Sequence, residues 1–535
     1  MTTPDTTPGT SPGAPDGQVL ADYLARTRWF GGKGRPFTVT AAHRVTEVPG
    51  RLEHSPHVLL FLVEVAYSDA DTSAASELYQ VPLACYLQPE GRLDHAFVGY
   101  WEDPELGWVH AYDALHDREA MACWQRSFER AAREGAEAAG AGTPLRFHRL
   151  PGHDLDLEAH STLLSGEQSN SSVVFGDDAL MKLFRKVTPG RNPDISIHEV
   201  LTRAECEFVA DLYGWVELET GALASAGASA SRARVEGSQV EDSEVIQLGM
   251  VQDFLRTATD GFDLALASVR TLFAEPDVPA EQSGGDFAGE AGRLGIAVAA
   301  IHQTLAEHFP TEARGAEAAR ALAGTMTDRL EVALGIVPGL AAYADRLRAT
   351  FAAVGELDSL QVQTVHGDLH LGQTLRTATG WKVVDFEGEP AKPLAERLLP
   401  DSPWRDVAGM LRSFDYAPRV VARTGGTVHT SGLEDDEAER RRERRILEWS
   451  QRSREHFLAG YAAYGTADGD LASAGRLALG PAREDGGPRV DLPHADRVLL
   501  EAYIADKAVY EAVYETRNRP AWVDIPMDAI ARITR

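Results

Sequence analysis

The stretch from residue 361 to residue 389 constrains this chain more than any other, because it sets two carboxylates at strand ends close together. Residues 361–365 alternate in polarity, as a strand with one buried face does, and a polar loop follows them. After a Thr-Gly turn signal, the apolar strand 381–384 ends at Asp385. The sequence therefore predicts a loop and a hairpin, in which Asp368 and Asp385 each follow a strand.

Asp368, Gln373 and Asp385 are the residue types that phosphoryl transfer from ATP requires. The transfer needs a carboxylate that orients the acceptor hydroxyl and takes its proton, and we assign this catalytic role to Asp368. It also needs hard oxygen ligands for Mg²⁺, and we assign these to Gln373 and Asp385. The alternative is that these are ordinary side chains of turns and caps. The spacing across the hairpin favours the catalytic interpretation, with ATP and Mg²⁺ as cofactors.

The same spacing resembles the catalytic loop of protein kinases and the metal-binding Asp that follows it. The sequence His-Gly-Asp-Leu-His, which replaces His-Arg-Asp, resembles the aminoglycoside-phosphotransferase-like branch of that superfamily. Gln373 stands where most members carry Asn, and its longer side chain keeps the amide oxygen. In this family, Asp406 would brace the catalytic loop through hydrogen bonds.

A second polar loop, residues 165–172, precedes two predicted strands. Such a turn can lay backbone amides over phosphates, and we therefore expect Ser169, Asn170 and Ser171 to contact the nucleotide. Lys182, in Ala-Leu-Met-Lys, is comparable to the kinase lysine that reaches the α- and β-phosphates. The alternative is an exposed lysine on a strand, which is the usual case. The order of loop, strand, turn and strand favours the nucleotide role.

Lys182 needs an acidic partner on the next helix, which an Asn-Pro pair begins. Asp194 and Glu199 are the candidates, and we expect Glu199, which lies a turn further inside the helix. A later strand runs into a connector that would be the hinge of a kinase-like fold. Backbone groups around Met250 and Gln252 would there bind adenine.

Composition excludes several classes of partner and site. Lys+Arg total 52 against 81 Asp+Glu, and the net charge of −29 repels nucleic acid and anionic membrane surfaces. The three cysteines are odd in number and far apart, which predicts neither a disulfide framework nor a zinc site and fits a cytoplasmic protein. The Pro/Gly/Thr-rich start lacks the apolar core of a signal peptide, and no apolar run is long enough for a transmembrane helix.

The chain is long enough for two or three domains. We expect an α+β protein with a bilobal, protein-kinase-like (aminoglycoside phosphotransferase-like) fold and an N-terminal α+β cap domain. Ala/Ser/Gly-rich and mixed-charge insertions are expected near 221–241 and 421–445. The expected parts are a disordered tail at 1–17, the cap at 18–110, a helical linker at 111–144, the N-lobe at 145–255, and the C-lobe with the sugar site at 256–535.

Longer motifs make the resemblance more specific, and the chain is similar to the bacterial maltokinases. The resemblance implies a cap domain fused to a kinase fold, which transfers phosphate from ATP to the anomeric hydroxyl of maltose or a similar small sugar. It also implies a role in glycogen or α-glucan synthesis beside a trehalose synthase-type partner. The motifs are RWFGGKGR (28–35), GEQSNSSVVF (166–175), QDFLRTATDGF (252–262), HGDLHLGQ (366–373), the block from DFEGEP to FDYA (385–417), and DKAVYEAVYETRNRPAW (506–522).

The identity of the sugar stays open between two kinds of acceptor. Lys507, Tyr510, Glu511 and Tyr514 share one helix face, which would suit a sugar, although the tyrosines could equally pack the lobe and Lys507–Glu511 form a surface pair. An amino-sugar such as glucosamine, or an aminoglycoside, would need carboxylates, which Glu511 and two glutamates after Asp385 could supply. A non-catalytic glucan-binding pseudokinase is a third alternative. The predicted substrate-binding set is His370, Glu387, Trp404, Lys507, Tyr510, Glu511 and Tyr514, with Glu389 as a further candidate carboxylate.

Overall fold

The computed structural model describes residues 13–68, 76–136, 140, 142–164, 170–221, 245–389, 392–424, 433–467, 478–480 and 487–534. The start of the predicted tail, Ser169, nearly all of the insertion predicted near 221–241, and residues 425–432 of the one predicted near 421–445 lie outside these residues. The chain divides into two compact units: residues up to 196 together with 211–256, and residues 197–210 together with 257–535. Each unit mixes helices and strands, which confirms the predicted α+β class. Every helix that the structure describes is too short or too polar to cross a bilayer.

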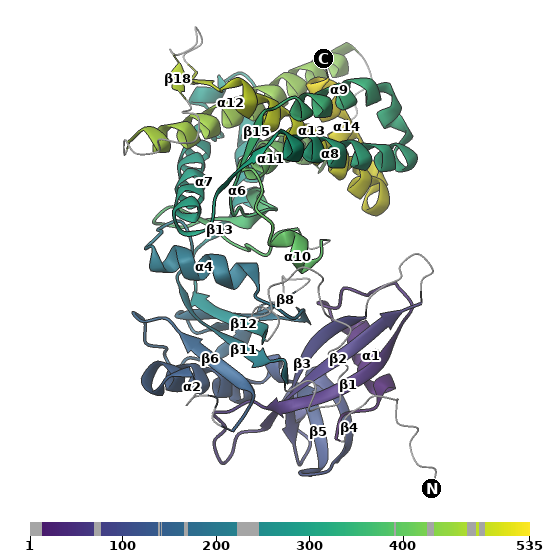
Figure 1. The fold of residues 1–535 in the computed structure, drawn as a ribbon, viewed down its shortest axis with the longest axis vertical. Coiled ribbons are helices and arrows are strands. Elements are labelled where there is room, and N and C mark those ends of the chain that lie inside the picture. The colour runs from purple at the N-terminus through teal and green to yellow at the C-terminus, as the bar shows by residue number, and fades with distance from the viewer. Residues whose placement is uncertain are drawn as a thin grey trace. The chain divides into compact units, whose positions relative to one another are not determined.

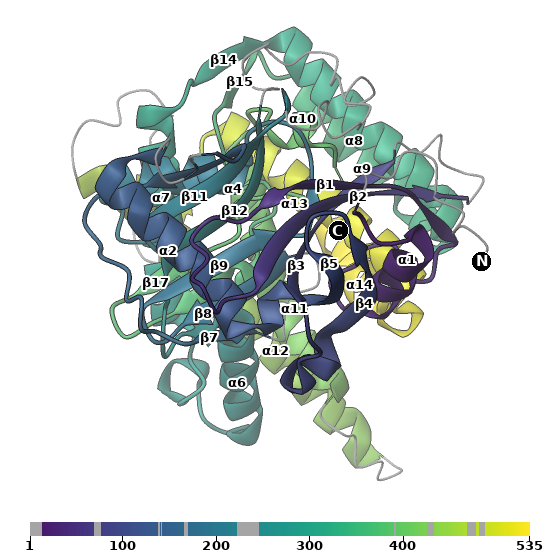
Figure 2. The ribbon, with the colours of Figure 1, turned by 90° about the horizontal axis from the view of Figure 1, so that it is seen from below.

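An antiparallel sheet with the strand order β1-β2-β3-β5-β4 begins the first unit. It curls around helix α1 (Gly17–Arg26), as Figure 2 shows, and buries Leu20, Tyr23 and Leu24 of that helix. The sequence predicted α1 and the first three strands, whose long apolar runs are evident. It did not single out the last two, in which several aromatic side chains face outward. The strands are β1 (Phe37–Glu47), β2 (His57–Tyr67), β3 (Glu77–Tyr86), β4 (Phe97–Asp103) and β5 (Gly107–Asp113).

A second antiparallel sheet in this unit carries Lys182 and follows the order β6-β11-β12-β9-β8-β7. Helix α2 (Arg118–Glu134) packs on it, with Phe128 edge-on against Phe147 of β6. Helix α4 (Pro193–Arg203) begins as predicted, where Asn192 Oδ1 accepts a hydrogen bond from the Asp194 amide. The strands are β6 (Leu145–Arg149), β7 (Ser161–Leu163), β8 (Asn170–Phe175), β9 (Ala179–Phe184), β11 (Leu212–Glu219) and β12 (Val245–Asp253).

The two sheets of the first unit are joined by backbone pairing and by a buried ion pair. Strand β10 (Lys186–Val187) pairs antiparallel with β3 of the cap sheet. The preceding residue, Arg185, is 1% exposed and donates to Asp113 at the end of β5 (2.9 Å) and to Ser171 Oγ on β8 (2.8 Å). Its guanidinium also lies over the ring of Trp29. Arg185 thus connects three segments that are far apart in the sequence.

The second unit is mainly helical (Figure 1), and it holds the largest hydrophobic core formed by the described residues. Helices α7 and α12 approach each other closely at Gly295. A Cβ at this position would lie only 2.1 Å from the Phe457 carbonyl oxygen, so the contact requires glycine. The helices are α6 (Gly261–Ala274), α7 (Ala288–His308), α8 (Ala316–Ile336), α9 (Ala344–Gly355), α10 (Leu394–Arg397), α11 (Trp404–Thr424), α12 (Leu433–Ala467), α13 (His494–Asn518) and α14 (Asp524–Ile533). The short strands are β13 (Thr259–Asp260), β14 (Glu312–Gly315), β15 (Ser359–Val362), β16 (Thr374–Arg376), β17 (Trp381–Val383), β18 (Ala478–Gly480) and β19 (Arg489–Asp491).

The predicted loop and hairpin are present in this unit. Strand β15 leads into the loop, and β16 and β17 form the antiparallel hairpin. Strand β13 extends the hairpin to a three-stranded sheet. Trp381 and Val383 are buried, so the strand that precedes Asp385 is fixed by the core.

Replacing Arg185 by Met should destabilise the first unit by about 3 kcal/mol, because it leaves the buried carboxylate of Asp113 without its cation. Arg146→Met is the matched control, since its pair with Glu219 is about half exposed and should contribute less than about 1 kcal/mol. Urea unfolding followed by tryptophan fluorescence measures both. Equal destabilisation by the two variants would show that the buried pair is not a main link between the sheets.

Candidate functional site

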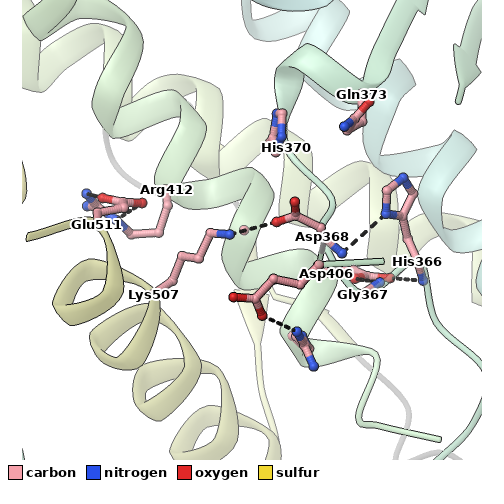
Figure 3. Close-up of polar contacts among 12 residues, drawn as sticks. His366, Gly367, Asp368, His370, Gln373, Asp406, Arg412, Lys507 and Glu511 are labelled. Atoms are coloured by element: carbon pink, nitrogen blue, oxygen red, sulfur yellow. Dashed lines mark hydrogen bonds and ion pairs between the residues drawn. The ribbon is translucent and has the colours of Figure 1, made fainter. Parts of the chain in front are cut away.

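The loop that carries Asp368 is held by one buried carboxylate, that of Asp406 at the start of α11 (Figure 3). Its Oδ2 accepts a hydrogen bond from the His366 amide (2.7 Å), and its Oδ1 accepts one from the Gly367 amide (2.9 Å). Gly367 has a φ of 84°, a conformation that disfavours side chains with a Cβ. The bracing role that the family resemblance implied for Asp406 therefore has a direct geometric basis.

Asp406 is 1% exposed, and its charge is stabilised from a third side by His302. His302 Nε2 lies 3.1 Å from Asp406 Oδ2, and its Nδ1 lies 2.9 Å from the Tyr461 hydroxyl. Burial acts to raise the pKa of Asp406, but the hydrogen bond and charge of His302 and the loop amides together hold it below its ordinary value. The buried His302 of α7 is thus also part of the support of the loop.

Helix α11 contacts the loop at two further points. A Cβ on Gly409 would lie 2.2 Å from the Leu369 carbonyl oxygen, so only glycine permits this approach. One turn on, Ser413 Oγ accepts a hydrogen bond from the Leu371 amide (3.1 Å). Together with Asp406, these contacts fix the backbone on both sides of Asp368.

Asp368 points toward helix α13, where Lys507 meets it (Figure 3). Lys507 Nζ lies 2.9 Å from Asp368 Oδ1, and the two side chains are 28% and 20% exposed. Burial acts to raise the pKa of Asp368, but the charge of Lys507 and then that of His370 outweigh it, so the pKa is lowered. The pKa of Lys507 is raised, because Asp368 more than offsets the effect of burial. The pair is therefore ionised on both sides at neutral pH.

The two predicted metal ligands lie side by side. Gln373 Nε2 donates to Asp385 Oδ2 (3.0 Å), and the Val384 amide donates to the Gln373 carbonyl oxygen (3.0 Å). Asp385 has a φ of 69°, an unfavourable conformation for a residue with a side chain. An amide oxygen and a carboxylate together suit a hard cation such as Mg²⁺.

Lys182 has a different acidic partner from the one the sequence led us to expect. Its Nζ lies 2.8 Å from Asp194 Oδ2, and both side chains are buried. Glu199 instead pairs with Arg203 on its own helix (2.8 Å). The prediction of Glu199 was wrong, because the first turn of α4, not its second, brings an acid to Lys182.

The hinge prediction also needs correction. Met250 and Gln252 lie within β12, with β11 on one side and β9 on the other. Their backbone groups belong to a central strand, so they do not form an open connector. The strand ends only at Asp253, and any connector begins after it.

The predicted phosphate loop is described only in part. Ser169 lies outside the described residues, while Asn170 and Ser171 begin β8 and are buried. Ser171 Oγ accepts the hydrogen bond from Arg185. The nucleotide role of these residues stays a prediction.

The predicted sugar-binding side chains divide into an exposed group and a buried one. Tyr510 and Tyr514 are 38% and 45% exposed and stack on each other. Trp404 is buried, and its Nε1 donates to Asp496 (2.9 Å), so its assignment as a sugar platform was wrong. Glu511 is paired with Arg412 (2.5 Å).

His370 and Glu387 each take part in a hydrogen bond that involves the backbone. His370 Nδ1 accepts a hydrogen bond from the Gly372 amide (3.1 Å), and burial lowers the pKa of its ring. The Glu387 carbonyl oxygen accepts one from Arg397 (2.9 Å). Their contact with a sugar stays a prediction.

Sequence reasoning named Asp194 only as the second candidate for Lys182, and it missed two partners in the site: Lys507 for Asp368, and Arg412 for Glu511. The last two join residues more than 90 positions apart. The available signal was charge complementarity between the loop that carries Asp368 and helix α13. That signal is shared by many other pairs in a chain with this many acids.

Two protein families match the chain. Residues 23–117 match the maltokinase N-terminal cap domain, and residues 276–444 match the phosphotransferase enzyme family. These matches confirm the resemblance to kinase-like phosphotransferases with a maltokinase-type cap.

Known proteins with similar sequences include two glucosamine kinases. That of Streptacidiphilus jiangxiensis is 31% identical over 291 residues, which cover 54% of this chain and 57% of the relative. That of Mycolicibacterium smegmatis is 28% identical over 261 residues, which cover 48% and 59%. The chain therefore aligns with less than two thirds of the length of either relative.

A solved structure of a glucosamine kinase with glucosamine, ADP and inorganic phosphate has the same overall fold. The TM-score is 0.60 at 21% identity, with 96% of this chain and 98% of that chain covered. At this identity the likeness concerns the fold alone. It confirms the predicted kinase-like architecture with an N-terminal cap.

Replacing Asp406 by Ala should release the loop. The His366 and Gly367 amides should lose protection against hydrogen exchange, and the second unit should lose about 3 kcal/mol, because both amides and His302 lose their buried acceptor. Since the pKa of Asp406 is lowered on folding, its contribution in the parent is complete above about pH 4 and is lost as the pH falls through the lowered value.

Hydrogen exchange with mass spectrometry, together with urea unfolding at pH 7, measures these effects. Asp358→Ala is the control, because Asp358 is exposed and lies just before β15, which leads into the same loop. Unchanged protection of the loop amides in Asp406→Ala would contradict the bracing role.

Proposed function

We propose that this chain, which joins a maltokinase-type cap to a phosphotransferase-family domain, is an ATP-dependent sugar kinase. Its proposed reaction is maltose and ATP giving maltose 1-phosphate and ADP, for α-glucan synthesis. The observation that carries the proposal is Asp368, which pairs with Lys507 on a loop whose backbone is held by Asp406 and Gly409. A rigid, charged carboxylate is what an acceptor hydroxyl needs for alignment and proton transfer.

In this proposal, Asp368 accepts a hydrogen bond from the acceptor hydroxyl and takes its proton as the oxygen attacks the γ-phosphate. Lys507 holds the carboxylate in place through its ion pair. Gln373 and Asp385 would hold Mg²⁺, which when bound neutralises charge on the phosphates. Lys182, oriented by Asp194, would contact the α- and β-phosphates.

Maltose as the acceptor rests on the cap match and on the motifs quoted above. An amino-sugar acceptor is the second candidate, because the curated relatives are glucosamine kinases. A panel of maltose, glucose, glucosamine, trehalose and kanamycin, assayed by ADP release with NMR of the product, separates the two. Turnover of glucosamine or kanamycin without turnover of maltose would replace the proposed substrate. Absence of Mg²⁺-dependent ADP release on every sugar would favour the non-catalytic alternative.

Asp368→Asn should lower kcat by at least about 100-fold, because the amide cannot take the hydroxyl proton. Nucleotide affinity should stay within about threefold of the parent, since the residue contacts the acceptor side. Steady-state kinetics and fluorescent nucleotide titration measure the two quantities. Comparable losses of kcat and of nucleotide affinity would point to a structural role for Asp368.

Asp385→Ala should remove the dependence of nucleotide binding on Mg²⁺, because a carboxylate ligand is lost. Asp401→Ala is the matched control, as a carboxylate of the same unit that pairs with Arg405 and Tyr503. Calorimetric titration of ATP with and without Mg²⁺ measures the effect. If Asp385→Ala binds Mg·ATP as tightly as the parent does, Asp385 is not the metal carboxylate.

A further inference from the structure

The ion pair between Lys507 and Asp368 places a fixed positive charge beside the proposed catalytic base. Lys507 projects from the middle of α13, and its neighbours Asp506 and Ala508 are buried in the core. The stem of the side chain is therefore anchored, and its ammonium also lies over the ring of Tyr510 (5.1 Å). The positive charge is therefore held in place by a helix that is packed against the core.

Two further glutamates that were candidates for pairing with an ammonium, Glu511 and Glu389, also have cations. Glu511 is paired with Arg412 (2.5 Å), which is buried and also contacts Asp415 (3.1 Å). Glu389 lies 3.3 Å from Lys392 and 3.3 Å from Arg405. Glu511 and Glu389 are thus not free to receive an ammonium from a ligand.

We infer that Lys507 is a specificity-determining residue, which makes this acceptor site select neutral sugars and reject amino-sugar cations. The inference rests on the proposed function and deepens it, since it names the class of acceptor. It goes beyond the phosphate-handling residues, which an amino-sugar kinase and a neutral-sugar kinase would share.

The physical reason is a balance of charge. A bound ammonium must be paired, because its removal from water is costly. At Asp368 the attraction of the carboxylate is already satisfied by Lys507, and a second cation within roughly 4–6 Å would meet a like charge. A neutral sugar pays no such cost, and its apolar ring face can lie against the exposed rings of Tyr510 and Tyr514.

The groups that act on Lys507 come from several elements. Asp368 and His370 lie on the catalytic loop, Glu511 one turn along α13, and Glu389 after the hairpin. The pKa values of Asp368 and His370 are lowered and that of Lys507 is raised, so these three groups keep the same charge at pH 6.5 and at pH 9. The ratio of the two rates therefore isolates the charge on the substrate amine.

The test compares kcat/KM for glucose and for glucosamine, which differ at one ring position, at pH 6.5 and pH 9. The amine of glucosamine should titrate at about pH 8, as the α-amino group of a peptide does. In the parent, the glucosamine-to-glucose ratio should be about tenfold lower at pH 6.5 than at pH 9. Lys507→Met should raise the ratio at pH 6.5 about tenfold and flatten its pH dependence, whereas Lys507→Arg should keep the behaviour of the parent.

A ratio near or above one for the parent at pH 6.5, or a ratio that Lys507→Met leaves unchanged, overturns the inference. If Lys507→Met is inactive or unfolded, the pH dependence of the parent and of Lys507→Arg decides. If no sugar is phosphorylated by the parent, the proposed function fails. Calorimetric titration then measures the affinities of the same two sugars for the parent and for Lys507→Met. If the parent binds glucosamine as tightly as glucose at pH 6.5, the inference is overturned.

Discussion

The hydrogen bonds to the buried carboxylate of Asp406 are the interaction on which the loop that carries Asp368 depends. A charge removed from water is costly unless it is fully hydrogen-bonded, and two loop amides together with His302 meet this condition. The same bonds decide the backbone path through Gly367, which has positive φ. The loop is therefore shaped by the requirement to satisfy one buried group.

The proposed chemistry follows from rigidity at one position and strain at another. Asp368 is presented from a loop that α11 holds from both sides, whereas Asp385 keeps an unfavourable φ because the core fixes the strand before it. Both features reduce the reorganisation that a transfer reaction would otherwise require. The helical core of the second unit supplies the support for both.

Local patterns in the sequence predicted much of the fold and many of the side chains in the candidate site. The loop, the hairpin, the start of α4 and the first three strands of the cap all have short-range signals in turn residues and periodicity, and they appear where expected. Pairings across long separations could not be predicted in the same way. Lys182 pairs with Asp194, not Glu199, because the first turn of α4 brings Asp194 to it. Trp404 is buried by the packing of helices that are distant in the sequence. Such outcomes depend on tertiary geometry that a periodic pattern does not encode.

The contacts between the two sheets of the first unit determine what removal of the cap would do to the rest of that unit. The cap sheet gives β3 to β10 and Asp113 to Arg185, so the boundary between the sheets is crossed by backbone and charge alike. A chain that began after the cap would keep β10 as an unpaired edge, open to association with other chains. It would also keep a buried guanidinium without its acid. Removal of the cap would therefore expose a strand edge and unpair a buried charge in the second sheet, and both changes favour aggregation over folding.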